Sequence, residues 1–237
     1  MRYGEPSIQN GLEKLRAAGV DELVVIPLYP QFSHTTTSSI YDAVDAALED
    51  MDWNPPQRRV QDYHVDEEWT CAIAQSIWEY REQNGPAEKL LFSLHGIPER
   101  YVRQGDPYRD QCEAGVRAVV DKLGLADDEW LLTFQSRVGR EPWLQPYTDE
   151  TLEELGKSGV KTVQVVCPGF AVTAACQPGS SRLPGTTCAA SAGVAAGIWL
   201  RSRTRTTRWW RGSRRTSAIS NTRRPWCSIS ATTRVAF

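Results

Sequence analysis

The stretch Lys89-Leu-Leu-Phe-Ser-Leu-His-Gly-Ile-Pro98 joins a continuous apolar run to a histidine and then to two turn-forming residues. An apolar run without polar alternation is typical of a strand that is buried on both faces of a parallel sheet. Gly96 and Pro98 predict a stiff turn immediately after this strand. Because ligands of open parallel sheets bind beyond the carboxyl ends of the strands, we expect His95 at the ligand-binding edge.

Strand-like and helical segments alternate on both sides of this stretch. Short apolar runs predict strands near residues 22–28, 89–93, 130–134 and 161–166, and a further short strand is expected near residues 58–62. Apolar residues at helical spacing, with terminal signals, predict helices within residues 5–18, 40–48, 69–80, 112–123 and 148–155. This alternation predicts an α/β fold in which helices cover both faces of parallel sheets.

Charge divides the 237-residue chain into two unlike parts. All 29 acidic residues lie within residues 1–170, together with 16 of the 27 basic ones, whereas residues 171–237 carry 11 arginines and no other charged residue. We therefore expect residues 171–237 to be an aberrant, irregular Arg-rich tail, in which residues 173–237 are the product of a shifted reading frame and do not fold independently. The alternative is a basic arm for nucleic acid, with Trp209 and Trp210 stacking on bases. We expect no nucleic-acid binding, because a selected arm would usually mix lysine with arginine.

Several classes of protein find no support in the sequence. No run of 18 or more uncharged apolar residues suggests a membrane span, and the N-terminus does not resemble a signal peptide, so a cytoplasmic location is expected. The six cysteines form no C-x-x-C pair, which argues against a disulfide framework or a zinc site. The chain contains neither G-x-G-x-x-G nor a Walker pattern, so nucleotide binding is unsupported.

His95 is the main candidate for chemistry. A neutral imidazole at a strand end can accept a proton or bind a divalent metal near neutral pH. The alternative is a histidine that only satisfies a nearby carbonyl group. We expect His34 and His64 to be solvated.

Aromatic and cationic side chains follow the other predicted strands. Flat aromatic surface that could line a cleft for a large planar ligand is supplied by Tyr29, Phe32, Trp143 and Tyr147. The alternative for each is core packing. Ligand carboxylates could be held by the polar loop that contains Ser136, Arg137, Gly139 and Arg140.

Together these segments resemble the ferrochelatase family over residues 1–170. The motifs that carry the resemblance are Met1-Arg-Tyr-Gly-Glu-Pro-Ser-Ile8, Pro27-Leu-Tyr-Pro-Gln-Phe-Ser33, Ser93-Leu-His-Gly-Ile-Pro-Glu-Arg-Tyr101, Gly105-Asp-Pro-Tyr108, Thr133-Phe-Gln-Ser-Arg-Val-Gly-Arg-Glu-Pro-Trp-Leu-Gln-Pro-Tyr-Thr148 and Val165-Val-Cys-Pro-Gly-Phe170.

The resemblance implies a chelatase-like fold of two doubly wound parallel-sheet domains with a porphyrin cleft between them. Residues 1–62 would be the carboxyl-terminal part of the first domain, which is expected to be incomplete because members of the family begin with further strands. Residues 63–170 would be the second domain.

The resemblance also implies insertion of Fe²⁺ into protoporphyrin or coproporphyrin in haem biosynthesis, with iron as substrate and no cofactor. His95 would be the iron ligand or the proton acceptor. The residues expected to approach the porphyrin are Tyr29, Gln31, Phe32 and Trp143, although Phe32 stands where the family often has a tyrosine.

One departure from the family bears on activity. After Cys167-Pro-Gly-Phe170 the family continues with an acidic helix whose glutamate faces the histidine, whereas no carboxylate follows here. We therefore expect the chain as written to be inactive or nearly so. A cobalt and sirohydrochlorin-type chelatase is the alternative chemistry. The choice of porphyrin, the oligomeric state and peripheral membrane contact of the parent enzyme stay open.

Overall fold

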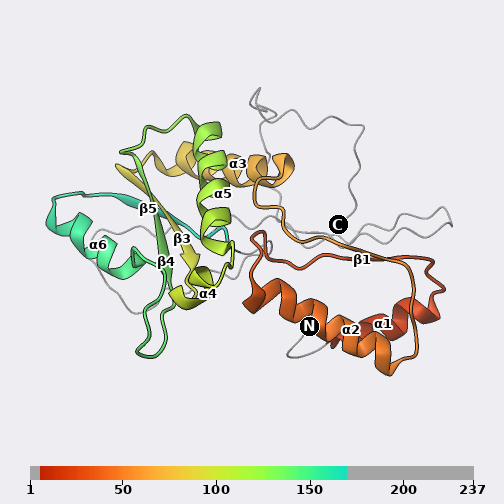
Figure 1. Cartoon of the computed structure of the whole chain (residues 1–237). Helices are drawn as coiled ribbons and strands as arrows, with labels where there is room; N and C mark the ends of the chain where they lie inside the picture. Colours follow the sequence, from red (N-terminus) through yellow and green to blue (C-terminus); the bar gives the residue numbers. More distant parts are fainter. Residues whose placement is uncertain (1–5, 170–237) are drawn as a thin grey trace.

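The computed structural model describes residues 6–169, in which helices and strands alternate as the sequence predicts (Figure 1). The first part contains α1 (Ile8–Ala17), β1 (Leu23–Val25), the π-helical turn η1 (His34–Ser38), α2 (Ser39–Asp50) and β2 (Gln57–Arg59). The second contains α3 (Glu67–Asn84), β3 (Lys89–His95), α4 (Glu99–Arg103), α5 (Tyr108–Leu123), β4 (Trp130–Gln135), α6 (Thr148–Lys157) and β5 (Val163–Val166).

The second part is a three-stranded parallel sheet in the order β4-β3-β5, with helices on both faces. On β3, Leu90 and Phe92 pack in one apolar cluster with residues of α3 and α5, which lie side by side in Figure 1. Leu91 points to the opposite face and packs with the apolar side of α6. Both faces of β3 are thus buried, which is why its sequence shows no polar alternation.

The first part is a two-stranded parallel sheet of β1 and β2. Leu23 of β1 packs with Leu12 of α1 and with Val44 and Leu48 of α2. Val24 points to the other face of the strand and is 49% exposed. Within residues 6–169, helices therefore cover one face of this sheet. The predicted α/β fold with parallel sheets is confirmed, and the proposed domain boundary between residues 62 and 63 stays a prediction.

Two short elements were not predicted. The π-helical turn η1 and helix α4 each contain five residues, which is too short to show an apolar period. The turn η1 begins where the Ser33 hydroxyl accepts a hydrogen bond from the Thr35 amide. Both elements follow strands and lie beside the predicted ligand edge.

Some expectations concern parts of the chain that the structure does not describe. The expected aberrant tail at 171–237 and its alternative nucleic-acid role lie outside the described residues. Within residues 6–169, no helix combines the length and the apolar character needed to cross a membrane.

Candidate functional site

His95 is the last residue of β3, and its side chain is exposed at the carboxyl edge of the sheet. Its Nδ1 lies 2.7 Å from the carbonyl oxygen of Gly96. A carbonyl oxygen can only accept a hydrogen bond, so Nδ1 carries the hydrogen in this contact. The lone pair is then on Nε2, which is the atom able to accept a proton or bind a metal ion.

Gly96 allows the turn after His95 to lie close to the neighbouring strand. Its amide donates a hydrogen bond of 2.8 Å to the carbonyl of Gln135, at the end of β4. A Cβ at this position would lie 3.1 Å from that carbonyl oxygen and 3.4 Å from Cε3 of Trp143. The lack of a side chain therefore permits close approach of both neighbours.

Trp143 lies next to His95. The Trp143 segment is joined to the His95 turn by hydrogen bonds of 3.0 Å from the Leu144 amide to Ile97 and from the Glu99 amide to Pro142. The centroids of the two rings are 6.5 Å apart, with 59° between their planes. The structure thus brings together two of the residues that the sequence singled out.

The loop after β1 holds the other three predicted site residues. Tyr29 and Phe32 are half-buried, whereas Gln31 is only 4% exposed. The Phe32 ring meets the His34 ring edge-on at 5.2 Å between centroids. The low exposure of Gln31 means that its side chain packs mainly within the protein, and its substrate contact stays a prediction.

This loop is anchored to residues far away in the sequence. The Tyr63 amide donates to the carbonyl of Pro30 at 2.9 Å, and the Phe32 amide donates to Oε1 of Gln111 at 2.6 Å. The loop is also bonded to Asp106, which the sequence patterns did not single out although it lies in the Gly105-Asp-Pro-Tyr108 motif. That motif was the only signal that could have drawn attention to it.

Arg137 is already engaged by neighbouring side chains. Its guanidinium forms ion pairs with Asp149 at 2.9 Å and Glu150 at 2.7 Å and lies 4.2 Å from the centroid of the Tyr147 ring. The hydrogen bond to Glu150 raises the pKa of Arg137. The structure therefore gives no support for Arg137 as a free partner for ligand carboxylates.

The two other histidines differ in burial. His34 is exposed, as expected, with Nδ1 3.2 Å from the hydroxyl of Ser38. The expectation for His64 was wrong, because its side chain is only 13% exposed and its Nδ1 lies 2.9 Å from the carboxylate of Asp62. The backbone of His64 also lies against Gly115 of α5, so this segment is packed on the helix.

His95 is not part of a preformed metal centre in the described part of the chain. No group of three or more His, Cys, Asp or Glu side chains that could hold a metal ion occurs within residues 6–169. A single imidazole leaves most of the coordination sphere of a divalent ion to other donors.

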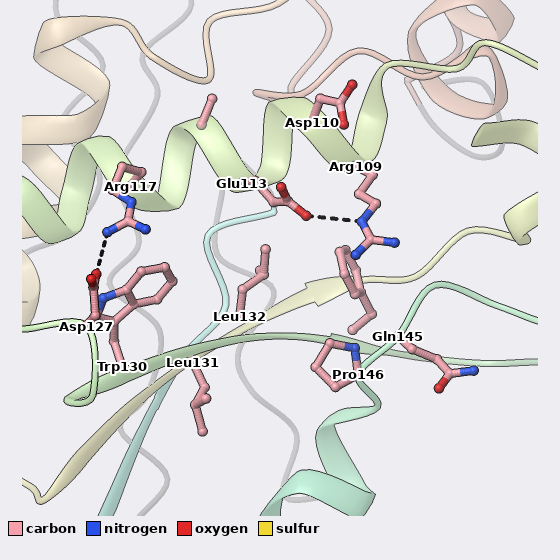
Figure 2. Close-up of a pocket in the computed structure, with 12 residues that line it drawn as sticks. Arg109, Asp110, Glu113, Arg117, Asp127, Trp130, Leu131, Leu132, Gln145 and Pro146 are labelled. Atoms are coloured by element: carbon pink, nitrogen blue, oxygen red, sulfur yellow. Dashed lines mark hydrogen bonds and ion pairs between the residues drawn. The ribbon is translucent and has the colours of Figure 1, made fainter. Parts of the chain in front are cut away.

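A hollow of about 710 Å³ lies between α5 and β4, away from the predicted site residues (Figure 2). Its apolar floor includes Trp130. Its rim carries the ion pairs Arg109–Glu113 and Arg117–Asp127, which Figure 2 marks with dashed lines. None of His95, Trp143 or the β1 loop residues lines it, so this hollow is not the predicted porphyrin cleft.

A solved structure supports the fold. The protein described as SirB from Bacillus subtilis with Fe³⁺ superposes with a TM-score of 0.50 at 17% sequence identity. The match covers 69% of this chain and 59% of that one. At this identity, the likeness supports the chelatase-like fold alone.

Sequence comparisons identify the family. A ferrochelatase of Stenotrophomonas maltophilia (strain R551-3) is 52% identical over 179 residues, covering 72% of this chain and 53% of its own length. A ferrochelatase of Thioalkalivibrio sulfidiphilus (strain HL-EbGR7) is 48% identical over 170 residues, covering 72% of this chain and 46% of its own length. The chain thus spans about half the length of the curated relatives it matches. The ferrochelatase family model matches residues 1–174, and the chain therefore belongs to the ferrochelatase family.

Proposed function

We propose that this chain supplies the histidine side of a site that inserts Fe²⁺ into a porphyrin in haem biosynthesis, a reaction of the lyase class. The observation that carries the proposal is the state of His95. Its Nδ1 lies 2.7 Å from the Gly96 carbonyl oxygen, an arrangement that leaves the lone pair of the neutral ring on Nε2, and Trp143 lies beside it. Membership of the ferrochelatase family supports the choice of reaction.

Metal insertion requires three events at the porphyrin nitrogens. The macrocycle must be bent, two pyrrole protons must leave, and a divalent iron must enter. A neutral imidazole can accept a pyrrole proton through Nε2, and its Nδ1–H stays bonded to the Gly96 carbonyl when the ring becomes charged. His95 thus suits either proton acceptance or delivery of iron.

Aromatic side chains account for recognition of the macrocycle. Trp143 lies beside His95, and Phe32 and Tyr29 belong to a loop that hydrogen bonds anchor to α5 and Tyr63. Flat rings bury a large apolar area against a planar ligand. We propose that these three residues, with Gln31, contact the porphyrin, and that the reaction takes place in the cytoplasm.

Binding and insertion can be tested separately. We would titrate the purified chain anaerobically with protoporphyrin IX and with coproporphyrin, following quenching of tryptophan fluorescence, and would then add Fe²⁺. We expect saturable porphyrin binding and slow insertion, because His95 has no group of metal-binding side chains around it within the described range. Loss of one catalytic partner typically slows a reaction by about a hundred- to ten-thousandfold.

The controls are His95→Ala and Asp110→Asn, the latter an exposed carboxylate on α5. We expect insertion to fall to the level without enzyme in His95→Ala and to stay unchanged in Asp110→Asn. Failure to bind either porphyrin would overturn the proposal. Faster insertion of Co²⁺ into sirohydrochlorin would instead support the alternative chelatase chemistry, which the ferrochelatase relatives do not favour.

A further inference from the structure

Asp106 is a buried carboxylate between two parts of the candidate site. It is 3% exposed and belongs to the turn between α4 and α5. Its Oδ2 accepts hydrogen bonds from the Ser33 hydroxyl at 2.8 Å and from the His34 amide at 2.9 Å. Its Oδ1 accepts one from the Tyr108 amide at 3.0 Å. Both oxygens are thus used, and the two donors on Oδ2 come from the loop after β1.

Tyr108 links the hydrogen bonds of Asp106 to the histidine, and we call this chain of hydrogen bonds the connection. Its hydroxyl donates a hydrogen bond of 2.8 Å to the carbonyl of His95 itself. The residue is 7% exposed, and burial raises the pKa of its phenol well above the ordinary value. The hydroxyl therefore stays protonated and remains a donor to His95.

The charge of Asp106 matters for this arrangement. All three contacts place a hydrogen toward the carboxylate, and a charged acceptor makes such bonds shorter and stronger than neutral ones. An asparagine has the same shape but carries two hydrogens on one of its two terminal atoms. Whichever way the amide turned, an N–H would face either the Tyr108 amide or the Ser33 and His34 donors. One end of the connection would be lost.

We infer that Asp106 is a positioning residue that fixes the aromatic loop of Tyr29–His34 relative to the His95 turn. The connection runs from Ser33 and His34 through the carboxylate to Tyr108 and from the Tyr108 hydroxyl to the backbone of His95. A second bond, from the Phe32 amide to Gln111, holds the same loop to the same helix. The inference deepens the proposed function and rests on it for the identity of the ligand.

The first experiment needs no porphyrin. The imidazole nitrogen resonances of His95 are recorded by NMR in the parent, in Asp106→Asn and in Asp110→Asn, the matched control on the exposed side of α5. Ser33→Ala is then introduced into the parent and into Asp106→Asn. We expect Ser33→Ala to shift the His95 resonances in the parent and to leave them unchanged in Asp106→Asn, because the carboxylate carries the connection. Equal shifts in both backgrounds, or none in either, would overturn the inference.

If Asp106→Asn does not fold, a milder pair of variants decides. Ser33→Ala and Tyr108→Phe each remove one hydroxyl at opposite ends of the connection and keep the carboxylate. We expect their effects on the His95 resonances to be non-additive in the double variant, as for residues in one hydrogen-bond network. Additive effects would contradict the inference.

A second readout uses zinc protoporphyrin, whose Soret band shifts when an imidazole binds the zinc axially. We expect Asp106→Asn to weaken this binding by up to about a hundredfold, which is the loss in rate that a misplacement of about 1 Å can cause. Asp110→Asn should bind like the parent. Parent-like binding in His95→Ala would show that His95 does not bind the zinc, which would overturn its proposed role. The NMR experiment would then be the test of the positioning role of Asp106. Weakened binding in His95→Ala with parent-like binding in Asp106→Asn would refute the positioning role alone.

Discussion

Gly115 offers a quantitative test of how the segment that precedes α3 packs against α5. It lies inside α5, where a Cβ would be 2.8 Å from the backbone carbonyl oxygen of His64 and 3.5 Å from the His64 Cβ. The near contact is a backbone atom, so a rotamer change cannot relieve it. The segment around His64 must move if Gly115 is replaced by alanine.

The expected magnitude follows from two opposing effects. Replacing glycine by alanine inside a helix favours folding by about 0.5–1 kcal/mol. Overpacking of a closely packed site costs about 1–3 kcal/mol. Gly156 of α6 is the matched control, because nothing lies within 4 Å of a Cβ built there. We therefore expect Gly156→Ala to unfold at higher urea than the parent and Gly115→Ala to have a free energy of unfolding about 1–3 kcal/mol below that of Gly156→Ala.

Urea unfolding followed by tryptophan fluorescence measures this difference. With a urea dependence of about 2 kcal/mol per molar, the midpoints of the two variants should differ by about 0.5–1.5 M. The displaced segment also includes Tyr63, whose amide bonds to Pro30 of the β1 loop. Gly115→Ala should consequently shift the NMR resonances of that loop. Equal midpoints for the two alanine variants would refute the close approach of His64 to α5.

Three further predictions concern single residues. His95→Ala should change the free energy of unfolding, measured with urea, by no more than about 0.5 kcal/mol, because the side chain is exposed. The same variant should abolish axial binding of zinc protoporphyrin, measured by the Soret band. Asp45→Asn should destabilise the chain by about 0.2–1 kcal/mol at pH 7, because the hydrogen bond from Arg59 lowers the pKa of Asp45. This stabilisation is complete above the ordinary value of 3.8 and is lost as pH falls through the lowered pKa of the folded state, so parent and variant should converge in acid-range unfolding measurements. Burial raises the pKa of the Cys112 thiol, so this residue should stay unmodified when the folded chain is treated with iodoacetamide. The half-buried Cys167 should react, and peptide mapping distinguishes the two residues.

The strands and long helices could be predicted because burial leaves a pattern in the sequence. β3 is covered on both faces and reads as a continuous apolar run, and α5 shows its buried side at helical spacing. The five-residue elements η1 and α4 leave no such pattern, because hydrogen bonds of turns and loops define them. Among the helices, length therefore decided which ones the sequence could reveal.

The candidate site was predictable only in part, for a similar reason. His95 could be predicted because it ends a buried strand. The contacts of Asp106 join residues 72 and 73 positions apart, and that of Gln111 joins residues 79 positions apart. A hydrogen bond between loops that are distant in the sequence leaves no periodic pattern of apolar residues. The packing of the His64 segment against α5 likewise could not be read from its neighbours in sequence.

A single exposed imidazole is better suited to transferring iron than to storing it. A site with three protein ligands would hold a divalent ion tightly and would compete with the porphyrin for it. Within residues 6–169 His95 belongs to no such group, and its Nε2 alone is available at the edge of the sheet. The porphyrin offers four nitrogen donors in one ring once its two pyrrole protons are lost. In the proposed reaction, movement of iron from one protein donor to four chelating donors would therefore be favourable, and we expect the main contribution of the protein to be holding the macrocycle against Nε2. The bonds at Gly96, Trp143 and Asp106, which set the position of the histidine and of the aromatic loop, should consequently affect catalysis more than the strength of iron binding does.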